Sequence, residues 1–511
     1  MRAPLPVDHA SGEFPRRIDP SIYLAAVGAV AVAVIVVYMP ALAFPALGAA
    51  AAVFFLNLGA RLPRIFLGSL IALLIGYAFL GRGLAHVGVA PVYVGEIVLC
   101  LGILAIITRL DRFTLEPFEI LILAFMAWGA IRTLPFYGQY GTDSLRDAVL
   151  WGYAVFALAI PVALGTEDRT RTMLRAFQIC LPLLLLWIPI VGLVASGIEF
   201  PHGPGSDVGI VSFKGGDMGV HLGGAAAFLA FGLYSENPGW RWPLGLLWVS
   251  WLAGVVVAGG LNRGGLLAAG ISLLVAFTMR PSVRMVQFAG IVGLIVLVAW
   301  IANLRVDIGD SGKHISVNEM TKRVSSVFGN EDEALEGTRA FRLEWWGEIA
   351  SYTFTGPYFW GGKGFGVNLA TDDGFQFDAE EALRAPHNSH MTVLARMGVP
   401  GFAMWIALQA AFAVSLWVAM RKAHSAGLTR WASIDAWLLI YWLAICLNAS
   451  FDPYLEGPQG GIWYWSIIGI GLYVLRLQRI EIDQVERAQR RRAYTIPPRR
   501  PPSRSADEAS A

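Results

Sequence analysis

The chain has 511 residues, of which 56% are hydrophobic and only 15% are charged, and its mean hydropathy is +0.56. Soluble globular domains carry about 25% charged residues, so this composition excludes an ordinary soluble protein and predicts a polytopic membrane protein. The formal net charge of +2 gives no reason to expect a nucleic-acid partner. The three cysteines lie in apolar stretches and indicate neither a disulfide framework nor a zinc site.

The predicted elements begin with a polar N-terminal tail, residues 1–20, which contains Arg16 and Arg17. No small-residue cleavage pattern follows the first apolar stretch, so the sequence predicts an uncleaved anchor rather than a signal peptide. Hydropathy then predicts an all-α fold with about 12–14 transmembrane helices. Their approximate limits are 21–39, 41–59, 64–80, 92–108, 117–136, 147–164, 176–197, 218–234, 242–259, 264–279, 286–303, 398–420, 432–449 and 461–476.

Basic residues favour one orientation of these helices. With the N-terminus in the cytoplasm, most of the 39 lysines and arginines fall on cytoplasmic segments, as the positive-inside rule requires. On the outer side, apart from one long loop, the basic residues are few: Arg82, Arg132, Arg146, Lys214, Arg263 and Arg396. The sequence therefore predicts that both termini are cytoplasmic.

Two longer polar segments interrupt or follow the spans. Residues 304–391 are predicted to form a loop on the outer face, between transmembrane regions 21–303 and 392–476, that folds over the membrane with short amphipathic helices. The basic, proline-rich segment 477–511 predicts a cytoplasmic tail that is disordered after a short helix. A site for anionic lipid headgroups is the alternative for this tail.

Two arginines beside predicted spans are candidate ligands for an anion. Arg263 lies in AGGLNRGGLLAAG, where flanking glycines would let an anionic group approach the backbone. The alternative is an arginine that extends to the membrane interface. Arg146 lies in GTDSLRDAVLW, and ion pairing with Asp143 or Asp147 explains it as well as ligand binding does.

The long loop contains a second pair of arginines. The stretch EALEGTRAFRLEWWGEIASY predicts an amphipathic helix with Ala340, Leu343, Trp346 and Ile349 or Ala350 on its apolar face. Arg339 and Arg342 are three residues apart, and guanidinium groups match phosphate oxygens, so the two can bind a pyrophosphate together. Glu336 can pair with Arg339, which leaves Arg342 as the stronger candidate.

Two further loop features have weaker functional signals. The segment GGKGFG lacks the Walker A pattern and predicts a tight turn rather than a phosphate loop. The carboxylates of residues 372–381 do not have EF-hand spacing, so we expect a solvated loop and no calcium site.

The stretch HNSHMTVLARMGVPG, residues 387–401, predicts a short capped helix followed by a membrane span. Asn388 or Ser389 can cap the helix, Gly398 can end it, and Pro400 can begin the span. His387 then lies at a helix N-terminus, where the positive helix end disfavours a protonated imidazole. A neutral imidazole near pH 7 is a competent general base.

These motifs resemble the O-antigen ligase and polymerase family of bacterial inner-membrane glycosyltransferases. The family pattern of His, then Asn, Ser or Gln, nine residues and Gly-x-x-Gly is matched in full by His387, Asn388, Gly398 and Gly401. Three segments resemble its Arg-x-x-x-Trp, Pro and Gly-x-Gly elements: RLEWW from Arg342, GP at 356–357, and GGKGFG. Asn262-Arg263-Gly264 is similar to its Ser-Arg-Gly element, with Asn in place of Ser.

The resemblance implies transfer of a glycan from undecaprenyl pyrophosphate to a hydroxyl of a glycolipid or glycan acceptor, at the periplasmic face. His387 would take the acceptor proton, and Asn388 would orient the acceptor or a sugar hydroxyl. The leaving pyrophosphate would be neutralised by Arg263 and Arg342, with Arg339 or Arg146. Inversion at the anomeric carbon is expected, and neither a metal nor a cofactor is implied, because arginines supply the positive charge.

Rival interpretations stay open at this point. A ligase and a polymerase share these motifs and differ in their acceptor, which is a terminal acceptor such as a lipid A core or another lipid-linked repeat unit. A secondary transporter or lipid flippase explains the many spans but not the polar cluster on the outer loop, and no internal repeat supports it.

Overall fold

The computed structural model describes residues 59, 61–89, 92–165, 167–194, 198–203, 207–236, 242–308, 313–325, 333–377 and 382–495. The predicted spans 21–39 and 41–59 lie almost wholly outside these residues. The chain divides into two units, Met1–Leu62 and Pro63–Ala511, and the architecture below is that of the second unit.

Nearly all of the described chain is helical, because backbone groups away from water must satisfy their hydrogen bonds within the segment. The first helices are α3 (Leu62–Leu80), α4 (Arg82–Ala85), α5 (Val94–Thr108), η2 (Leu110–Arg112), α6 (Pro117–Tyr140), α7 (Thr142–Gly152), α8 (Ala154–Leu164), α9 (Glu167–Val194), α10 (Gly215–Ala230), η3 (Leu233–Glu236), α11 (Leu244–Leu261), α12 (Arg263–Met279) and α13 (Val283–Ile301). The later ones are α14 (Val317–Ser325), α15 (Glu333–Ala350), η5 (Ser351–Thr355), α16 (Leu369–Asp372), α17 (Ser389–Ser425), α18 (Thr429–Ala449), η6 (Tyr454–Glu456) and α19 (Pro458–Thr495).

Strands form only two small antiparallel hairpins in the described residues. The first joins β1 (Gly88–Val89) to β2 (Val92–Tyr93), with Gly88 opposite Tyr93. The second joins β3 (Arg305–Ile308) to β4 (Lys313–Ser316), with Arg305 opposite Ser316.

Within the described residues, 7 helices are long and apolar enough to cross a membrane, and the bent pair α7 and α8 makes up to 8. The shorter apolar helices are α5, α12 and α13. Each predicted span from 64–80 onward corresponds to one of the helices above, except 147–164, which corresponds to the bent pair α7 and α8. The chain is therefore an all-α polytopic membrane protein, as predicted, and fewer of its helices have full spanning length than hydropathy suggested.

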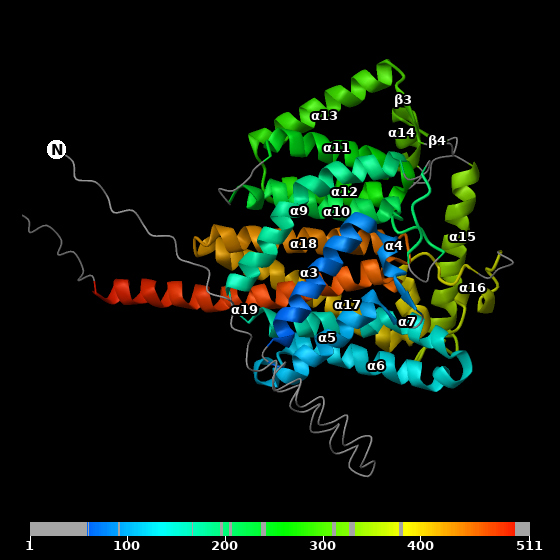
Figure 1. Ribbon diagram of the computed structural model, residues 1–511, viewed down its shortest axis with the longest axis horizontal. Coiled ribbons are helices and arrows are strands. Elements are labelled where there is room, and N and C mark those ends of the chain that lie inside the picture. The colour runs from blue at the N-terminus through cyan, green and yellow to red at the C-terminus, as the bar shows by residue number, and fades with distance from the viewer. Residues whose placement is uncertain are drawn as a thin grey trace, which may run out of the picture. The chain divides into compact units, whose positions relative to one another are not determined.

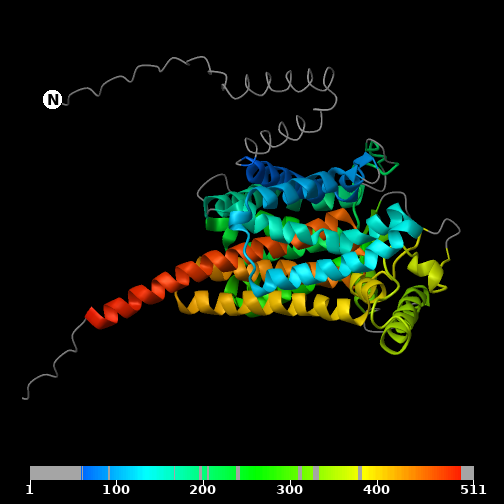
Figure 2. The same ribbon diagram turned by 90° about the horizontal axis from the view of Figure 1, so that it is seen from below.

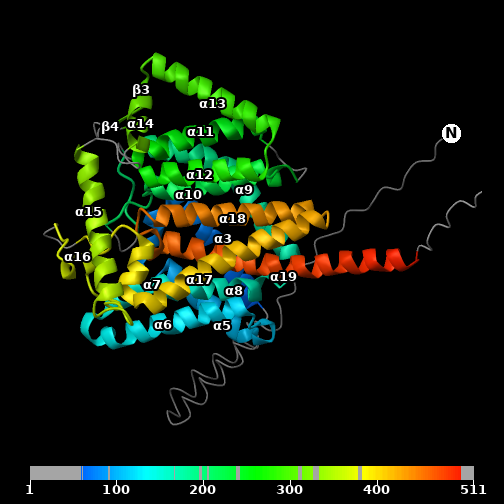
Figure 3. The same ribbon diagram turned by 180° about the vertical axis from the view of Figure 1, so that it is seen from behind.

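The helices of this unit run side by side, and α15 lies across one end of them (Figures 1 and 2). Helix α10 packs against α11, α12 and α18, while α17 packs against α6 and α18. Helix α19 packs along α8 and then extends away from the end opposite α15 (Figure 3). The loop segments that carry the polar motifs thus gather at the end covered by α15.

Helix α17 is broken at Gly398, which has φ 67° and ψ −172°. The break and Pro400 remove helical hydrogen bonds, so the freed backbone groups need other partners. The glycine-rich loop before α16 and one tryptophan supply them: Lys363 N–H to Ala395 O (2.7 Å), Gly364 N–H to Arg396 O (3.1 Å), Trp128 Nε1–H to Met397 O (2.9 Å), and Val399 N–H to Phe359 O (2.8 Å). The predicted break at Gly398 is confirmed, and the predicted tight turn at GGKGFG packs directly on it.

Replacing Gly398 by alanine is expected to destabilise the fold. A Cβ there would lie 2.5 Å from Phe359 O, and an L-residue in this left-handed conformation costs about 1–3 kcal/mol. The purified variant should unfold at a lower temperature in detergent. Gly270→Ala is the matched control, because its Cβ meets nothing within 4 Å. Equal unfolding temperatures for the two variants would contradict this account of the break.

The buried face of α15 differs from the predicted one. Leu343, placed on the apolar face by the sequence, is 51% exposed, and Trp345, which was not placed there, is fully buried, whereas Ile349 is buried as predicted. The ring of Trp345 stacks on Phe375, and its Nε1–H donates to Asp373 at 2.6 Å. With Trp345 in these contacts, the helix is rotated relative to the prediction, and the Asp373 side chain is buried rather than solvated.

The C-terminal segment also differs from its prediction. A short helix followed by disorder was predicted for the tail 477–511, and helix α19 continues to Thr495. The first part of this extension pairs with α6, since Arg476 contacts Glu119 of that helix and Arg479 contacts Glu116, its N-cap residue. Residues 496–511 lie outside the described residues.

Candidate active site

The site begins at the start of α17. Asn388 is the N-cap, and its side-chain oxygen accepts hydrogen bonds from His390 N–H (3.0 Å) and Met391 N–H (3.2 Å). Ser389 is fully buried, and its hydroxyl donates to Asp452 O (3.3 Å) and accepts from Leu455 N–H (3.2 Å). The cap predicted from the sequence is confirmed, and the hydrogen bonds of Ser389 connect it to the turn between α18 and α19.

His387 lies just before this cap in a constrained conformation. Its φ is 53°, a left-handed value that is uncommon for a residue other than glycine. Its Nδ1 is buried and has no hydrogen-bond partner among the described residues. Burial lowers the pKa of His387, the positive charges of Arg342 and Lys214 lower it further, and Asp452 opposes them. The imidazole is therefore neutral near pH 7, with a nitrogen that can accept a proton.

Asp452 forms an ion pair at the centre of the site. Lys214 Nζ lies 2.9 Å from Asp452 Oδ1, and the carboxylate is only 9% exposed. Lys214 is the N-cap of α10 and comes from a connection that is far from His387 in sequence. The pair holds one cation and one anion beside the imidazole.

Arg342 and Arg263 bring two guanidinium groups to the same place. Arg342 Nη1–H donates to Phe451 O at 3.2 Å, while its buried Nε has no partner among the described residues. The positive charge of Arg263 acts on Arg342, so the two lie close together. Arg263 is the first residue of α12, which Asn262 caps through bonds from Gly264 N–H (2.6 Å) and Gly265 N–H (3.3 Å).

The N-termini of α10, α12 and α17 meet around this group. Helices α10 and α12 approach so closely that a Cβ on Gly265 would lie 2.1 Å from Gly215 O. The partial positive charge of a helix N-terminus favours anions, so these three ends add to the charges of the side chains. We name Lys214, Arg263, Arg342, His387 and Asp452 the cationic cluster. This arrangement can bind a multiply charged oxyanion beside a general base.

Comparison with family models connects this geometry to a known class of proteins. Residues 248–406 match the model of the O-antigen ligase family. Residues 248–406 are thus similar to an O-antigen ligase domain, and we refer to this segment by that name. The match supports the O-antigen ligase and polymerase family, and with it a glycosyltransferase function in polysaccharide biosynthesis. A comparison with curated proteins found no match.

The O-antigen ligase domain includes Arg263, Arg342 and His387 but not the whole cationic cluster. Lys214 precedes residue 248, and Asp452 follows residue 406. The structure also explains the substitution of Asn262 for the serine of the family motif, because an asparagine side chain caps a helix as well as serine does.

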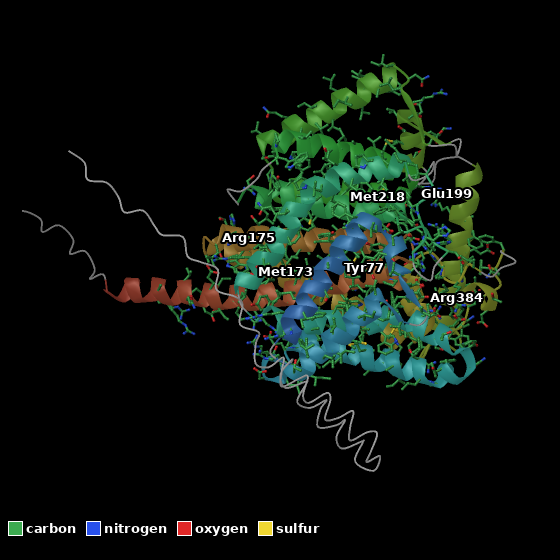
Figure 4. The ribbon with its side chains drawn as sticks, in the orientation of Figure 1. Tyr77, Met173, Arg175, Glu199, Met218 and Arg384 are labelled. Atoms are coloured by element: carbon green, nitrogen blue, oxygen red, sulfur yellow. The ribbon has the colours of Figure 1, made fainter. Side chains whose placement is uncertain are left out.

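The two other predicted ligands, Arg146 and Arg339, are not part of the cationic cluster. Arg146 is half exposed and pairs with Asp143 (3.4 Å) and Asp147 (3.5 Å), so the local ion pairing considered from the sequence is present. Arg384, labelled in Figure 4, pairs with the same two acids. Arg339 is exposed on α15, one turn before Arg342.

His390 and Arg396 of the O-antigen ligase domain have packing partners. Trp405 Nε1–H donates to His390 Nδ1 at 3.0 Å, and His390 Nε2 lies 3.2 Å from Cys446 O. Arg396 is only 1% exposed, lies 2.9 Å from Asp147 and donates to carbonyls of the glycine-rich loop at Gly364 (3.2 Å) and Val367 (3.1 Å). Both residues hold the scaffold behind the cationic cluster.

Lys214 and Asp452 are the site residues that the sequence did not single out for this role. Lys214 directly precedes the GGD start of α10, and Asp452 lies in FDPYLEG, between the last two spans. The sequence offered one signal for them, because both residues lie at the ends of spans on the predicted outer side. Among the described residues, no group of three or more His, Cys, Asp or Glu side chains is arranged to hold a metal ion.

Proposed function

We propose that this protein transfers a glycan from undecaprenyl pyrophosphate to an acceptor hydroxyl at the periplasmic face of the bacterial inner membrane. The observation that carries the proposal is His387, a neutral imidazole with an unpartnered buried Nδ1, beside the cations Arg342 and Lys214. A general base next to a multiply cationic site fits a reaction in which a hydroxyl loses a proton and a pyrophosphate leaves.

The proposed reaction is a single displacement. The acceptor oxygen attacks the anomeric carbon on the side opposite the pyrophosphate, the new glycosidic bond forms, and the bond from that carbon to the phosphate oxygen breaks with inversion. His387 takes the proton of the hydroxyl, while Arg263 and Arg342 stabilise the charge that develops on the leaving pyrophosphate. In this mechanism side-chain cations supply the stabilisation, and we propose that it is independent of a metal.

The remaining predicted ligands have smaller roles in this proposal. The side-chain oxygen of Asn388 is used by the helix cap, so its amide nitrogen is the group that would orient an acceptor or sugar hydroxyl. The geometry favours Arg263 and Arg342 over Arg339, which is exposed, and Arg146, which is paired.

The proposed orientation places residues 304–391 and the cationic cluster in the periplasm. Lys214 and Arg263, which the positive-inside rule assigned to the outer face, lie in the cluster to which α15 contributes Arg342. Both termini, including the tail 477–511, are then cytoplasmic.

Complementation of a host strain that lacks the gene tests the proposal and separates its two forms. Surface glycolipids are compared on a gel with the extracted undecaprenyl-linked glycans. A ligase, which we favour, predicts bare acceptor and accumulated long lipid-linked polymers in the deletion strain. A polymerase predicts acceptor that carries only one repeat unit. Normal glycolipids and normal lipid-linked glycans in the deletion strain would contradict both forms and favour a transporter of another substrate.

The transfer rate is expected to fall at acidic pH with a midpoint below about 6.5, the usual pKa of histidine. Only unprotonated His387 accepts a proton, so the rate is full above its lowered pKa and is lost as the pH falls through it. Since Arg342 helps to lower that pKa, the residual activity of Arg342→Gln should show its acidic limb at a higher pH. The pH dependence of kcat/KM measures both. An unshifted limb in Arg342→Gln would disprove the coupling.

A further inference from the structure

The segment that follows α3 lies against the cationic cluster, although it is outside the O-antigen ligase match. Arg82 N–H donates to Ser212 O at 2.7 Å, and Ser212 N–H donates to Leu80 O at 3.0 Å. These bonds form a parallel bridge between Gly81 and Ser212, only two residues before Lys214. The first residue of α4 is thus held in fixed register with the connection that leads into the cluster.

The side chain of Arg82 has no ion pair or hydrogen bond among the described residues, although it is half-buried. Its charge acts on two neighbours, the buried carboxylate of Asp217 and the ring of His86, whose pKa is lowered by burial and then by Arg82. A guanidinium has five donors in a planar fork, and burying part of it without a partner is unfavourable. A partly buried arginine with unpaired donors, close to other cations, is suited to bind an oxyanion.

Asp217 shows that Arg82 and Lys214 lie near one point. Asp217 is in the first turn of α10 and is 3% exposed, and the cations whose charges act on it are Lys214 and Arg82. Lys214 in turn acts on His387. Asp217 and His387 are thus both neighbours of Lys214, whose own charge is already paired with Asp452.

We propose that Arg82 is a further ligand-binding residue, which binds an oxyanion beside Lys214. The inference rests on the proposed function and assigns Arg82 to the distal phosphate of the lipid pyrophosphate, the phosphate farther from the sugar. Arg263 and Arg342 then bind the phosphate nearer the reacting carbon. A carboxylate of an acidic sugar in the glycan is the other source of the same chemistry.

Binding to the full-length protein in nanodiscs tests this assignment. The probes are farnesyl pyrophosphate, farnesyl monophosphate and a short glucuronate-containing oligosaccharide. Wild type should bind the pyrophosphate more tightly than the monophosphate. In Arg82→Gln the affinity for pyrophosphate should fall about tenfold and that for monophosphate less than twofold, so that the preference is lost, and Arg82→Lys should restore part of it.

Matched controls separate this inference from the proposed function. Arg175→Gln removes an exposed arginine on α9, away from α4, and should change neither affinity (Figure 4). A wild-type protein without preference for pyrophosphate would contradict the proposed function itself. Preference in wild type that survives in Arg82→Gln would overturn only the assignment of Arg82. Loss confined to the glucuronate probe would move the oxyanion from the lipid to the glycan and overturn the pyrophosphate assignment.

Discussion

His387→Ala is expected to abolish glycan transfer while the protein still accumulates in the membrane. General base catalysis contributes about 10²–10⁴-fold to a rate, and no other described histidine lies in the cationic cluster to replace the imidazole. His390 is held between Trp405 and Cys446 and cannot take over without losing both contacts. The measurement is transfer by purified protein from a lipid-linked glycan, with membrane levels compared by immunoblot.

The fold is expected to survive this substitution. The Nδ1 of His387 has no partner, so alanine removes no hydrogen bond from that atom, and the left-handed φ is already adopted by a residue with a Cβ. His424→Ala, at the exposed far end of α17, is the matched control and should transfer at the wild-type rate. Full activity of His387→Ala would contradict the assignment of His387 as the general base and would favour the transporter interpretation.

Arg342→Ala is expected to lower the transfer rate about 10²–10³-fold, the range found when one stabilising donor of a developing oxyanion is removed. The loss should appear in kcat as well as in kcat/KM, because the charge on the pyrophosphate grows as the bond breaks. Arg342→Lys should recover part of the rate, since it restores the charge but not the planar pair of donors. Steady-state kinetics over a series of donor concentrations gives kcat and kcat/KM for each variant and distinguishes these outcomes.

The neighbouring arginine of the same helix provides the comparison. Arg339→Ala removes the same charge one turn earlier, from an exposed position, and should cause a much smaller loss. A larger loss at Arg339 than at Arg342 would contradict the placement of α15 described above. Loss of protein from the membrane in Arg342→Ala would assign the residue to folding through its bond to Phe451.

Local patterns in the sequence predicted most helices and the start of the site. The length of the apolar stretches predicted the spans. Asn388 and Gly398 predicted a helix cap and a helix break, and both are present in the structure. Such features depend on residues within one turn of each other, so they can be recognised without knowing the fold.

Contacts between distant segments could not be predicted in the same way. Lys214 meets Asp452 across 238 residues, and the partners of the broken α17 come from a loop more than 30 residues earlier. The rotation of α15 could not be predicted from the helical spacing of apolar residues either, because it depends on Phe375 and Asp373 as partners for Trp345. The positive-inside rule was more informative, since it assigned Arg82, Lys214 and Arg263 to one face before any contact was known.

The hydrogen bonds at the break of α17 have a consequence for protein engineering. The loop residues Phe359, Lys363 and Gly364 complete a helix that belongs to the membrane region. A chimera that exchanged only this loop would keep the backbone bonds at the break only if the new loop followed the same path past α17. Residues 359–364 and 395–399 therefore form one packing unit, and they should be exchanged together rather than as a loop alone.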